Sequence, residues 1–298
     1  MNSVSSLLQP SKKTGTSPGK DNWHARLELA YEKTPSKTIL SHRLHKGPLV
    51  IQKPFYPESE TCHSYLIHPP GGIVGGDILE LDVVLHPESH ALITTPAANK
   101  FYRSKQEVAL LKQTIKIENN AILEWLPQET IFYNQCNADI HTEFDLGEDA
   151  HLSYWEINCF GRPAGNDYFK QGLVKQKIEV KRNGVPIYID RNIIDSESTI
   201  LSAKWGLNNF PVMATMLVTL PMEFNSVSAN KINIEAIEAL QQQSDKRIVS
   251  FTLRDDLLLI RYFGYHAREA LALYTECWTA IRPQLLNKKC CPPRIWAT

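Results

Sequence analysis

Apolar and polar residues alternate with a period of two from Trp23 to about Trp205, and this pattern restricts the fold more than any other feature of the chain. A period of two is typical of β-strands, because successive side chains of a strand point to opposite faces of the sheet. The pattern runs through "ILELDVVLHP", "EVALLKQTIKIENNAILEWLP" and "LVKQKIEVKRNGVPIYIDRNII". Turn-forming sequences such as "PPGG", "HPES", "ENNA" and "RNG" separate the strands.

Residues 21–205 are therefore expected to form a mainly β body, as a sandwich, a barrel or a solenoid. The phrases "ENNAILEW" and "GEDAHLSYW" are alike, because each is a polar turn followed by a strand that contains a tryptophan. Self-similarity of this kind favours a β-helical, solenoid-like stack of strands.

The pattern changes after residue 205, and residues 206–286 are expected to form a small α+β segment packed on the body. The segment "RIVSFTLRDDLLLIRYFG" predicts a hairpin, and "INIEAIEALQQQ" predicts a helix. A second, longer helix is predicted for "HAREALALYTECWTAIRPQLL", whose apolar stripe consists of Ala270, Leu273, Tyr274, Cys277 and Ile281. Residues 287–298 are expected to be an extended tail, since Pro292 and Pro293 disfavour a helix there.

Composition and charge exclude several classes of protein. The chain has 32 basic and 32 acidic residues, so no global field attracts it to nucleic acid or to an anionic membrane. No segment approaches the ~20 consecutive apolar residues that a membrane span needs. The six cysteines show neither a CxxC pair nor the spacing of a disulfide framework, which favours a reducing, cytoplasmic setting. Residues 1–20 are rich in Ser, Lys, Gly and Pro, and we expect a disordered leader.

The stretch "HPPGGIVGGD", residues 68–77, invites comparison with phosphate-binding loops, but it lacks their chemistry. A Walker A loop places a lysine after its last glycine, whereas Asp77 follows here. A dinucleotide-binding loop opens a helix, whereas the segment after Asp77 has the pattern of a strand. We expect a close-packed corner built on Gly71, Gly72, Gly75 and Gly76.

A second stretch, "HALITTPAANKFYRS" at residues 90–104, follows this corner, and the two together resemble the UreD family of urease accessory proteins, called UreH in some bacteria. Further phrases fit the same family in the same order: "GPLVIQKPFYPE", "LEWLPQETIFY", "WEINCFGRP" and the terminal "PRIWAT". The resemblance covers nearly the whole chain from Trp23 onward. Asn99 and the alanines before it depart from the family phrase, in which a glycine and small residues precede the lysine.

The resemblance implies a β-rich helical stack of strands that has no catalytic activity of its own. Members of the family are scaffolds that act with UreF and the GTPase UreG to deliver nickel into apo-urease. UreD contacts urease itself, and UreF bridges to UreG. No tightly bound cofactor is implied, and Ni²⁺ would bind only transiently.

Transfer of nickel calls for weak, exchangeable ligands, and carboxylates inside a β-stack would supply them. Asp77, Glu156 and Asp190 are the candidates, because they lie within or beside the family-like phrases or in an otherwise apolar strand. We predict that these three acids line a hydrated passage for Ni²⁺. The alternatives are that Asp77 caps the glycine corner, that Glu156 lies on an exposed strand face, and that Asp190 pairs with Arg191 or Arg182.

Four other residues are candidates for structural or interface roles. Lys100 and Tyr102 lie in "NKFYRS", where we expect Lys100 to form an ion pair near Asp77. The role of Arg103 in the same phrase stays open between such a corner and a partner contact. Trp296 near the C-terminus is a candidate anchor for UreF.

Two other functions compete with nickel delivery. One is a stand-alone β-rich hydrolase that uses Asp77 and Glu156 as a carboxylate pair, with Arg103 or His68 nearby. The chain contains no nucleophile motif such as GxSxG, which counts against this function. The other is a purely structural protein that holds UreF and urease together without contacting nickel.

Overall fold

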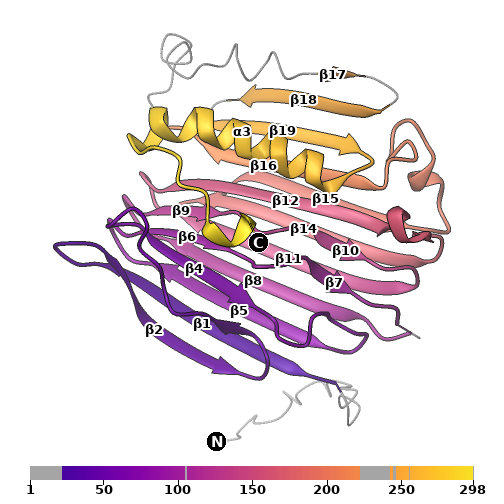
Figure 1. Ribbon diagram of the computed structural model, residues 1–298, viewed down its shortest axis with the longest axis horizontal. Helices are drawn as coiled ribbons and strands as arrows, with labels where there is room; N and C mark the ends of the chain where they lie inside the picture. Colours follow the sequence, from indigo (N-terminus) through magenta and orange to yellow (C-terminus); the bar gives the residue numbers. More distant parts are fainter. Residues whose placement is uncertain (1–21, 105, 222–241, 244–245, 255, 298) are drawn as a thin grey trace, which may run out of the picture.

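The computed structural model describes residues 22–104, 106–221, 242–243, 246–254 and 256–297, and these form two large sheets stacked face to face (Figure 1). The first sheet has seven strands, in the order β15 (Val185–Asp195), β14 (Gly172–Arg182), β11 (Cys136–Leu146), β8 (Ala109–Ile117), β5 (Ile78–Leu85), β1 (His24–Lys33) and β2 (Thr38–Lys46).

The second sheet has twelve strands. Nine of them follow one another in the order β17 (Gln242–Gln243), β18 (Arg247–Arg254), β19 (Leu257–Gly264), β16 (Val212–Thr219), β12 (His151–Arg162), β9 (Ile122–Trp125), β6 (His90–Thr94), β4 (Cys62–Ile67) and β3 (Val50–Ile51). The short strands β7 (Asn99–Phe101), β10 (Thr130–Phe132) and β13 (Asp167–Tyr168) extend β12 to the side.

The chain winds between the two sheets as a solenoid of about four turns. Strands β1, β5, β8, β11 and β14 pair in parallel in the first sheet, and β4, β6, β9 and β12 pair in parallel in the second. Each turn passes from one sheet to the other through a short corner, as from β5 to β6, and returns after a further short strand, as from β7 to β8. The predicted mainly β, solenoid-like fold is confirmed.

Antiparallel strands close the stack. Strand β2 pairs with β1 at one end, and β15 pairs with β14 at the other. In the second sheet, β16, β19 and β18 continue from β12 as an antiparallel meander, which includes the hairpin expected from the sequence. Of the helix predicted from "INIEAIEALQQQ", residues 232–241 lie outside the described part of the chain, and Gln242–Gln243 form β17.

Helix α3 (Ala267–Leu286) lies across the outer face of the second sheet (Figure 1). All five residues of its predicted apolar stripe are buried, and they pack on β12, β16 and β19 in a core that is separate from the one between the sheets. The tail turns back after α3, with a 3-10 helix η3 at Arg294–Ala297. Across the described ranges, no helix has the length and apolar character needed to cross a bilayer.

Candidate functional site

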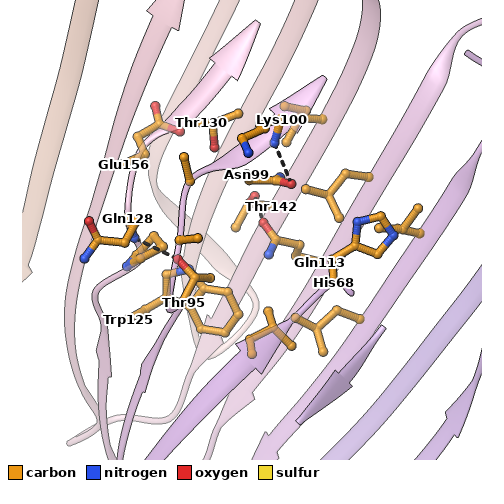
Figure 2. Close-up of a pocket in the computed structure, with 18 of the residues that line it drawn as sticks. His68, Thr95, Asn99, Lys100, Gln113, Trp125, Gln128, Thr130, Thr142 and Glu156 are labelled. Carbon is orange, nitrogen blue, oxygen red and sulfur yellow. Dashed lines mark hydrogen bonds between the residues drawn. The ribbon is translucent and has the colours of Figure 1, made fainter. Parts of the chain in front are cut away.

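A cavity of about 200 Å³ lies between the two sheets. The side chains on one wall come from the inward faces of β5, β8, β11 and β14, and those on the other come from β9, β12 and residues 95–100. Figure 2 shows Glu156 and His68 on opposite sides of this cavity. The wall is apolar in part, but polar side chains interrupt it at several points.

The register of the strands brings these polar side chains together. Gln113 and Thr142 are partners in the pairing of β8 with β11, and the Thr142 hydroxyl donates to Gln113 Oε1 at 3.0 Å. Gln176 on β14 reaches across to the second sheet, where its Nε2 donates to Asn158 Oδ1 at 3.1 Å. Each of these residues occupies a position in its strand that otherwise carries apolar residues facing the core.

Most of the unpartnered buried polar atoms lie at this cavity. Seven buried side-chain nitrogen or oxygen atoms of the described residues have no hydrogen-bond partner in the protein, and five of them belong to His68, Glu156, Asn158 and Gln176, which all line the cavity. Leaving a buried polar group unpaired costs about 1–3 kcal/mol. Because five such atoms share one polar space, we infer that water or a bound ion satisfies them.

Glu156 is the carboxylate at the cavity wall. Its Oε2 accepts a hydrogen bond from the Tyr154 hydroxyl at 3.1 Å, while its Oε1 has no partner. Burial raises the pKa of Glu156 to about 7, and the nearby Asp190 carboxylate adds to that increase. The group can therefore gain or lose a proton near neutral pH.

Asp190 lies near Glu156, on the facing sheet. Its Oδ2 accepts hydrogen bonds from the Tyr188 hydroxyl and from an Arg261 guanidinium nitrogen, both at 3.1 Å. The same Arg261 nitrogen also lies 3.1 Å from the Tyr188 oxygen. The alternative in which Asp190 pairs with Arg191 or Arg182 is wrong: Arg191 is on the outer face of β15, and Arg182 pairs with Asp256 at 3.1 Å.

Asp77 is buried at the glycine corner, outside the residues that line the cavity. Its two carboxylate oxygens accept hydrogen bonds from the backbone N–H of Trp23 at 2.9 Å and of Val74 at 3.0 Å. It therefore caps the corner, as the alternative interpretation expected. His68 lies between Asp77 and the cavity, and burial lowers the pKa of its imidazole, against the opposing effect of the Asp77 charge.

The glycine stretch packs against the "NKFYRS" strand. The backbone N–H of Ile73 donates to the carbonyl oxygen of Lys100 at 2.7 Å, and the carbonyl oxygen of Ile73 accepts from the N–H of Tyr102 at 2.8 Å. A Cβ atom on Gly72 would lie 2.1 Å from the Tyr102 ring, so only glycine fits there. Gly71 and Gly76 have positive φ angles of 82° and 89°, which suit glycine in the tight turns on either side.

The other candidates of this region occupy separate places. The ion pair expected between Lys100 and Asp77 is absent from the described contacts, and Lys100 lines the cavity instead. Arg103 is exposed beside a surface cleft that runs along the corners preceding β8, β11 and β14. Trp296 lies against the body: its Nε1 donates to Thr94 Oγ1 at 2.9 Å, and its ring contacts Trp155 and Trp278.

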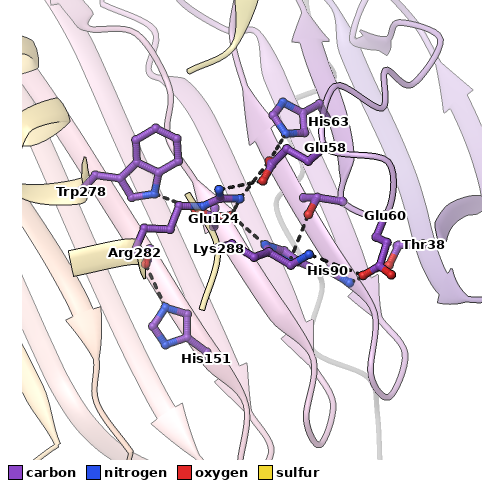
Figure 3. A network of polar contacts seen from close by, with 12 residues as sticks. Thr38, Glu58, Glu60, His63, His90, Glu124, His151, Trp278, Arg282 and Lys288 are labelled. Atoms are coloured by element: carbon purple, nitrogen blue, oxygen red, sulfur yellow. Dashed lines mark hydrogen bonds and ion pairs between the residues drawn. The ribbon is translucent and has the colours of Figure 1, made fainter. Parts of the chain in front are cut away.

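A second polar cluster holds α3 and the tail to the solenoid (Figure 3). The completely buried Glu124 carboxylate accepts hydrogen bonds from His90 at 2.7 Å, from Trp278 at 2.6 Å and from Arg282 at 2.9 and 3.0 Å. Arg282 also pairs with Glu58 at 2.7 Å. Burial alone would raise the pKa of Glu124, but His90 and Arg282 outweigh burial and lower it to about 2. Among the described residues, the Glu124 carboxylate and the Arg282 guanidinium of this cluster thus satisfy one another.

The ionisable groups in and near the cavity do not form a compact metal site. Across the described ranges, no three His, Cys, Asp or Glu side chains converge as a metal-binding group. Glu156 and His68 line the cavity, Asp190 lies close to Glu156, and carboxylate and imidazole groups suit divalent transition metals. Such dispersed groups would bind a divalent cation weakly, because only one or two of them could coordinate it at the same time. Water would complete the coordination.

Several polar residues of this interior were missed from the sequence: Tyr154, Asn158, Gln176, Arg261 and, as a lining residue, His68. A signal for Gln176 was present, since it interrupts the apolar row Val174, Ile178 and Val180 of one strand. Arg261 carried no such signal, because it meets Asp190 only through the packing of one sheet on the other.

The sequence matches a family model and several known proteins over nearly its whole length. The family model described as UreD urease accessory protein matches residues 24–297. The urease accessory protein UreD of Alcanivorax borkumensis is 38% identical over 296 residues, which cover 99% of this chain and 98% of that protein. UreD of Enterobacter sp. strain 638 is 40% identical over 283 residues, or 93% of this chain and 96% of that protein. The chain therefore belongs to the UreD family of urease accessory proteins.

Proposed function

We propose that this protein is a urease maturation factor that binds apo-urease and, together with UreF and the GTPase UreG, passes Ni²⁺ toward the urease active site. In this proposal nickel is cargo, and the protein holds no resident cofactor and carries out no catalysis of its own. Family membership supports the role in maturation. The cavity between the two sheets supports the contact with nickel.

The observation that carries the proposal is the gathering of unpartnered polar atoms of His68, Glu156, Asn158 and Gln176 at one cavity. A folded core does not keep such atoms without a reason, because each one is costly unless it is hydrated or bound. An interior lined in this way lets a hydrated divalent cation exchange water for carboxylate, amide and imidazole groups. The exchange would be reversible, since no full ligand set is present in the described part of the chain.

Two of the three acids predicted from the sequence remain candidates for contact with nickel. Glu156 and Asp190 are near one another at one side of the interior, and they are the acids that we propose contact nickel. Asp77 gives both oxygens to backbone N–H groups, so we propose that it acts through the fold of the corner. The hydrolase alternative required Asp77 and Glu156 as a pair, and only Glu156 lines the cavity.

Deletion and restoration test the maturation role. Cells that carry the complete urease gene set are compared with and without this gene, and urease activity, urease nickel content and urease protein level are measured. We expect activity and nickel to fall together on deletion, at unchanged urease level, and to recover on restoration. Normal activity in the deletion strain would refute the proposed role.

Variants then separate nickel transfer from scaffolding. Asp190→Asn and Glu156→Gln remove charge while keeping shape, and Glu143→Gln is the matched control on the outer face, where Glu143 pairs with Lys181 at 2.7 Å. We expect the double variant Glu156→Gln/Asp190→Asn to assemble with its partners but to deliver little nickel. Full delivery by the double variant would favour a scaffold that does not contact nickel.

A further inference from the structure

Among the described residues, Arg261 supplies the guanidinium that contacts Asp190, and this position has a consequence for how Asp190 and Glu156 bind metal. Its terminal nitrogen lies 3.1 Å from Asp190 Oδ2, and its charge also acts on Glu156. The side chain of Arg261 is 40% exposed, whereas that of Asp190 is 13% exposed. The guanidinium therefore lies at the solvent side of the pair.

The register explains why one arginine reaches both acids. Glu156 on β12 is the partner of Thr215 on β16, and Thr215 is the partner of Arg261 on β19. The three residues form one row across the sheet, in which neighbouring strands are about 4.8 Å apart. Asp190 comes from the facing sheet, and it brings a second carboxylate near Glu156 and within 3.1 Å of the Arg261 guanidinium.

We infer that Arg261 is a built-in counterion gate: its guanidinium occupies the position at Asp190 that a divalent cation would take, and it keeps the affinity of the acid pair for metal low. This inference rests on the proposed function, since it concerns the same two carboxylates. A cation that binds both acids must displace the guanidinium from Asp190. Displacement is feasible because the side chain borders solvent and can rotate outward.

Transfer of nickel requires that the cation bind and then leave, and a counterion at Asp190 allows both. Two buried carboxylates with no counterion would bind a divalent cation tightly and trap it, whereas transfer requires release. With Arg261 in place, the returning guanidinium neutralises Asp190 as the cation leaves, so the acids are not left as uncompensated buried charges. The Tyr188 hydroxyl lies 3.1 Å from the same Arg261 nitrogen, so it gives the guanidinium a second hydrogen-bond partner when it returns to Asp190.

Titration of the purified full-length protein, co-expressed with its partner proteins, tests the gate. Ni²⁺ is added in competition with a chromophoric chelator, and the dissociation constant is compared among variants. Arg261→Gln should tighten Ni²⁺ binding by about tenfold or more, because a unit charge near the site is removed. The extra affinity should disappear when Glu156→Gln and Asp190→Asn are added.

Two control variants isolate the charge and its position. Arg261→Lys keeps the positive charge and should bind Ni²⁺ nearly as the unmodified protein does. Arg191→Gln removes a positive charge from the neighbouring position on β15, which is exposed on the outer face, and should have little effect. An unchanged affinity in Arg261→Gln would overturn the gate, and so would a gain that persists without the two acids.

A second readout distinguishes failure of the gate from failure of the passage. In cells, Arg261→Gln should raise the nickel retained by the purified accessory complex and lower the nickel content of urease. If the acid variants abolish delivery but Arg261→Gln leaves both nickel contents unchanged, the passage stands and the gate is wrong. If Arg261→Gln tightens binding but the acid variants deliver nickel normally, the acids bind metal outside the delivery route.

Discussion

Glu156 shows how the fold changes the chemistry of a single residue. As part of "SYWEINCF", it could equally have been a solvated acid on a strand face. The structure turns it toward the cavity, next to Asp190, and burial raises its pKa to about 7. A carboxyl group that is half protonated near neutral pH binds a divalent cation only by releasing its proton, so its affinity for metal depends on pH.

The raised pKa of Glu156 predicts a pH dependence of stability. The ordinary pKa of 4.5 applies to the unfolded chain, and about 7 applies to the folded protein. As pH rises from 4.5 to 7, the unfolded chain loses this proton before the folded protein does, so the free energy of unfolding falls. Above pH 7 the full effect is reached, and the free energy of unfolding is then lower by about 3 kcal/mol.

Glu156→Gln tests this dependence, because glutamine cannot ionise. Relative to the unmodified protein, the variant should gain about 3 kcal/mol of stability between pH 4.5 and pH 8. Chemical denaturation at several pH values measures the difference. A stability difference that stays constant across this range would show that the pKa of Glu156 is not raised.

The need for glycine at position 72 comes from one neighbouring side chain, the ring of Tyr102. Gly72→Ala places a Cβ atom 2.1 Å from that ring, and displacement of the ring should cost about 1–3 kcal/mol of unfolding free energy. In a Tyr102→Ala background the same substitution should cost much less, because the obstacle is gone. Equal costs in the two backgrounds, measured by a double-mutant cycle, would contradict this explanation of the glycine.

At the scale of elements, helix α3 is held to the β-stack by buried ion pairs as well as by its apolar stripe. The stripe could be predicted from sequence because helical spacing determines which residues share a face. The attachment of Arg282 to Glu124 and Glu58 could not, since it joins residues 158 and 224 positions apart. Long-range pairing of this kind leaves no periodic signal in the chain.

The loss of Arg282 should therefore loosen α3 strongly. Arg282→Ala removes the guanidinium that pairs with the buried Glu124 carboxylate, and we expect a loss of about 3–5 kcal/mol in unfolding free energy. Lys288→Ala is the matched control, because Lys288 pairs at 3.5 Å with the exposed Glu60 and should cost no more than about 1 kcal/mol. Equal losses in the two variants would show that the Arg282 cluster contributes little to holding the helix.

At the scale of the whole molecule, the alternating pattern and the regular turns predicted a mainly β body but left a sandwich, a barrel and a solenoid open. The likeness of two turn-and-strand phrases and the resemblance to the UreD family favoured the solenoid, in which each turn repeats the same local geometry. The cavity depends instead on which polar residues of different turns share one register, such as Gln113 with Thr142. Sequence spacing does not report that alignment, so Glu156 and Asp190 could be nominated but not placed together.

The whole molecule also explains why Asp77 differs from the other two nominated acids. It lies at a corner between turns of the solenoid, where backbone N–H groups lack strand partners and a carboxylate satisfies them. Glu156 and Asp190 lie on strands that face the interior, where side-chain hydroxyl and guanidinium groups donate to the two carboxylates instead. The position of an acid within the turn of the solenoid thus determines whether it stabilises a corner or faces the interior.

The most direct test of the central claim, that the interior acids conduct nickel, is the nickel content of urease matured by Glu156→Gln/Asp190→Asn. Urease is purified from cells that carry the complete urease gene set, and its nickel is counted per active site beside the Glu143→Gln control. We predict a large loss of nickel in the double variant, a normal content in the control, and equal amounts of assembled accessory complex in both. Urease fully loaded with nickel by the double variant would contradict the claim.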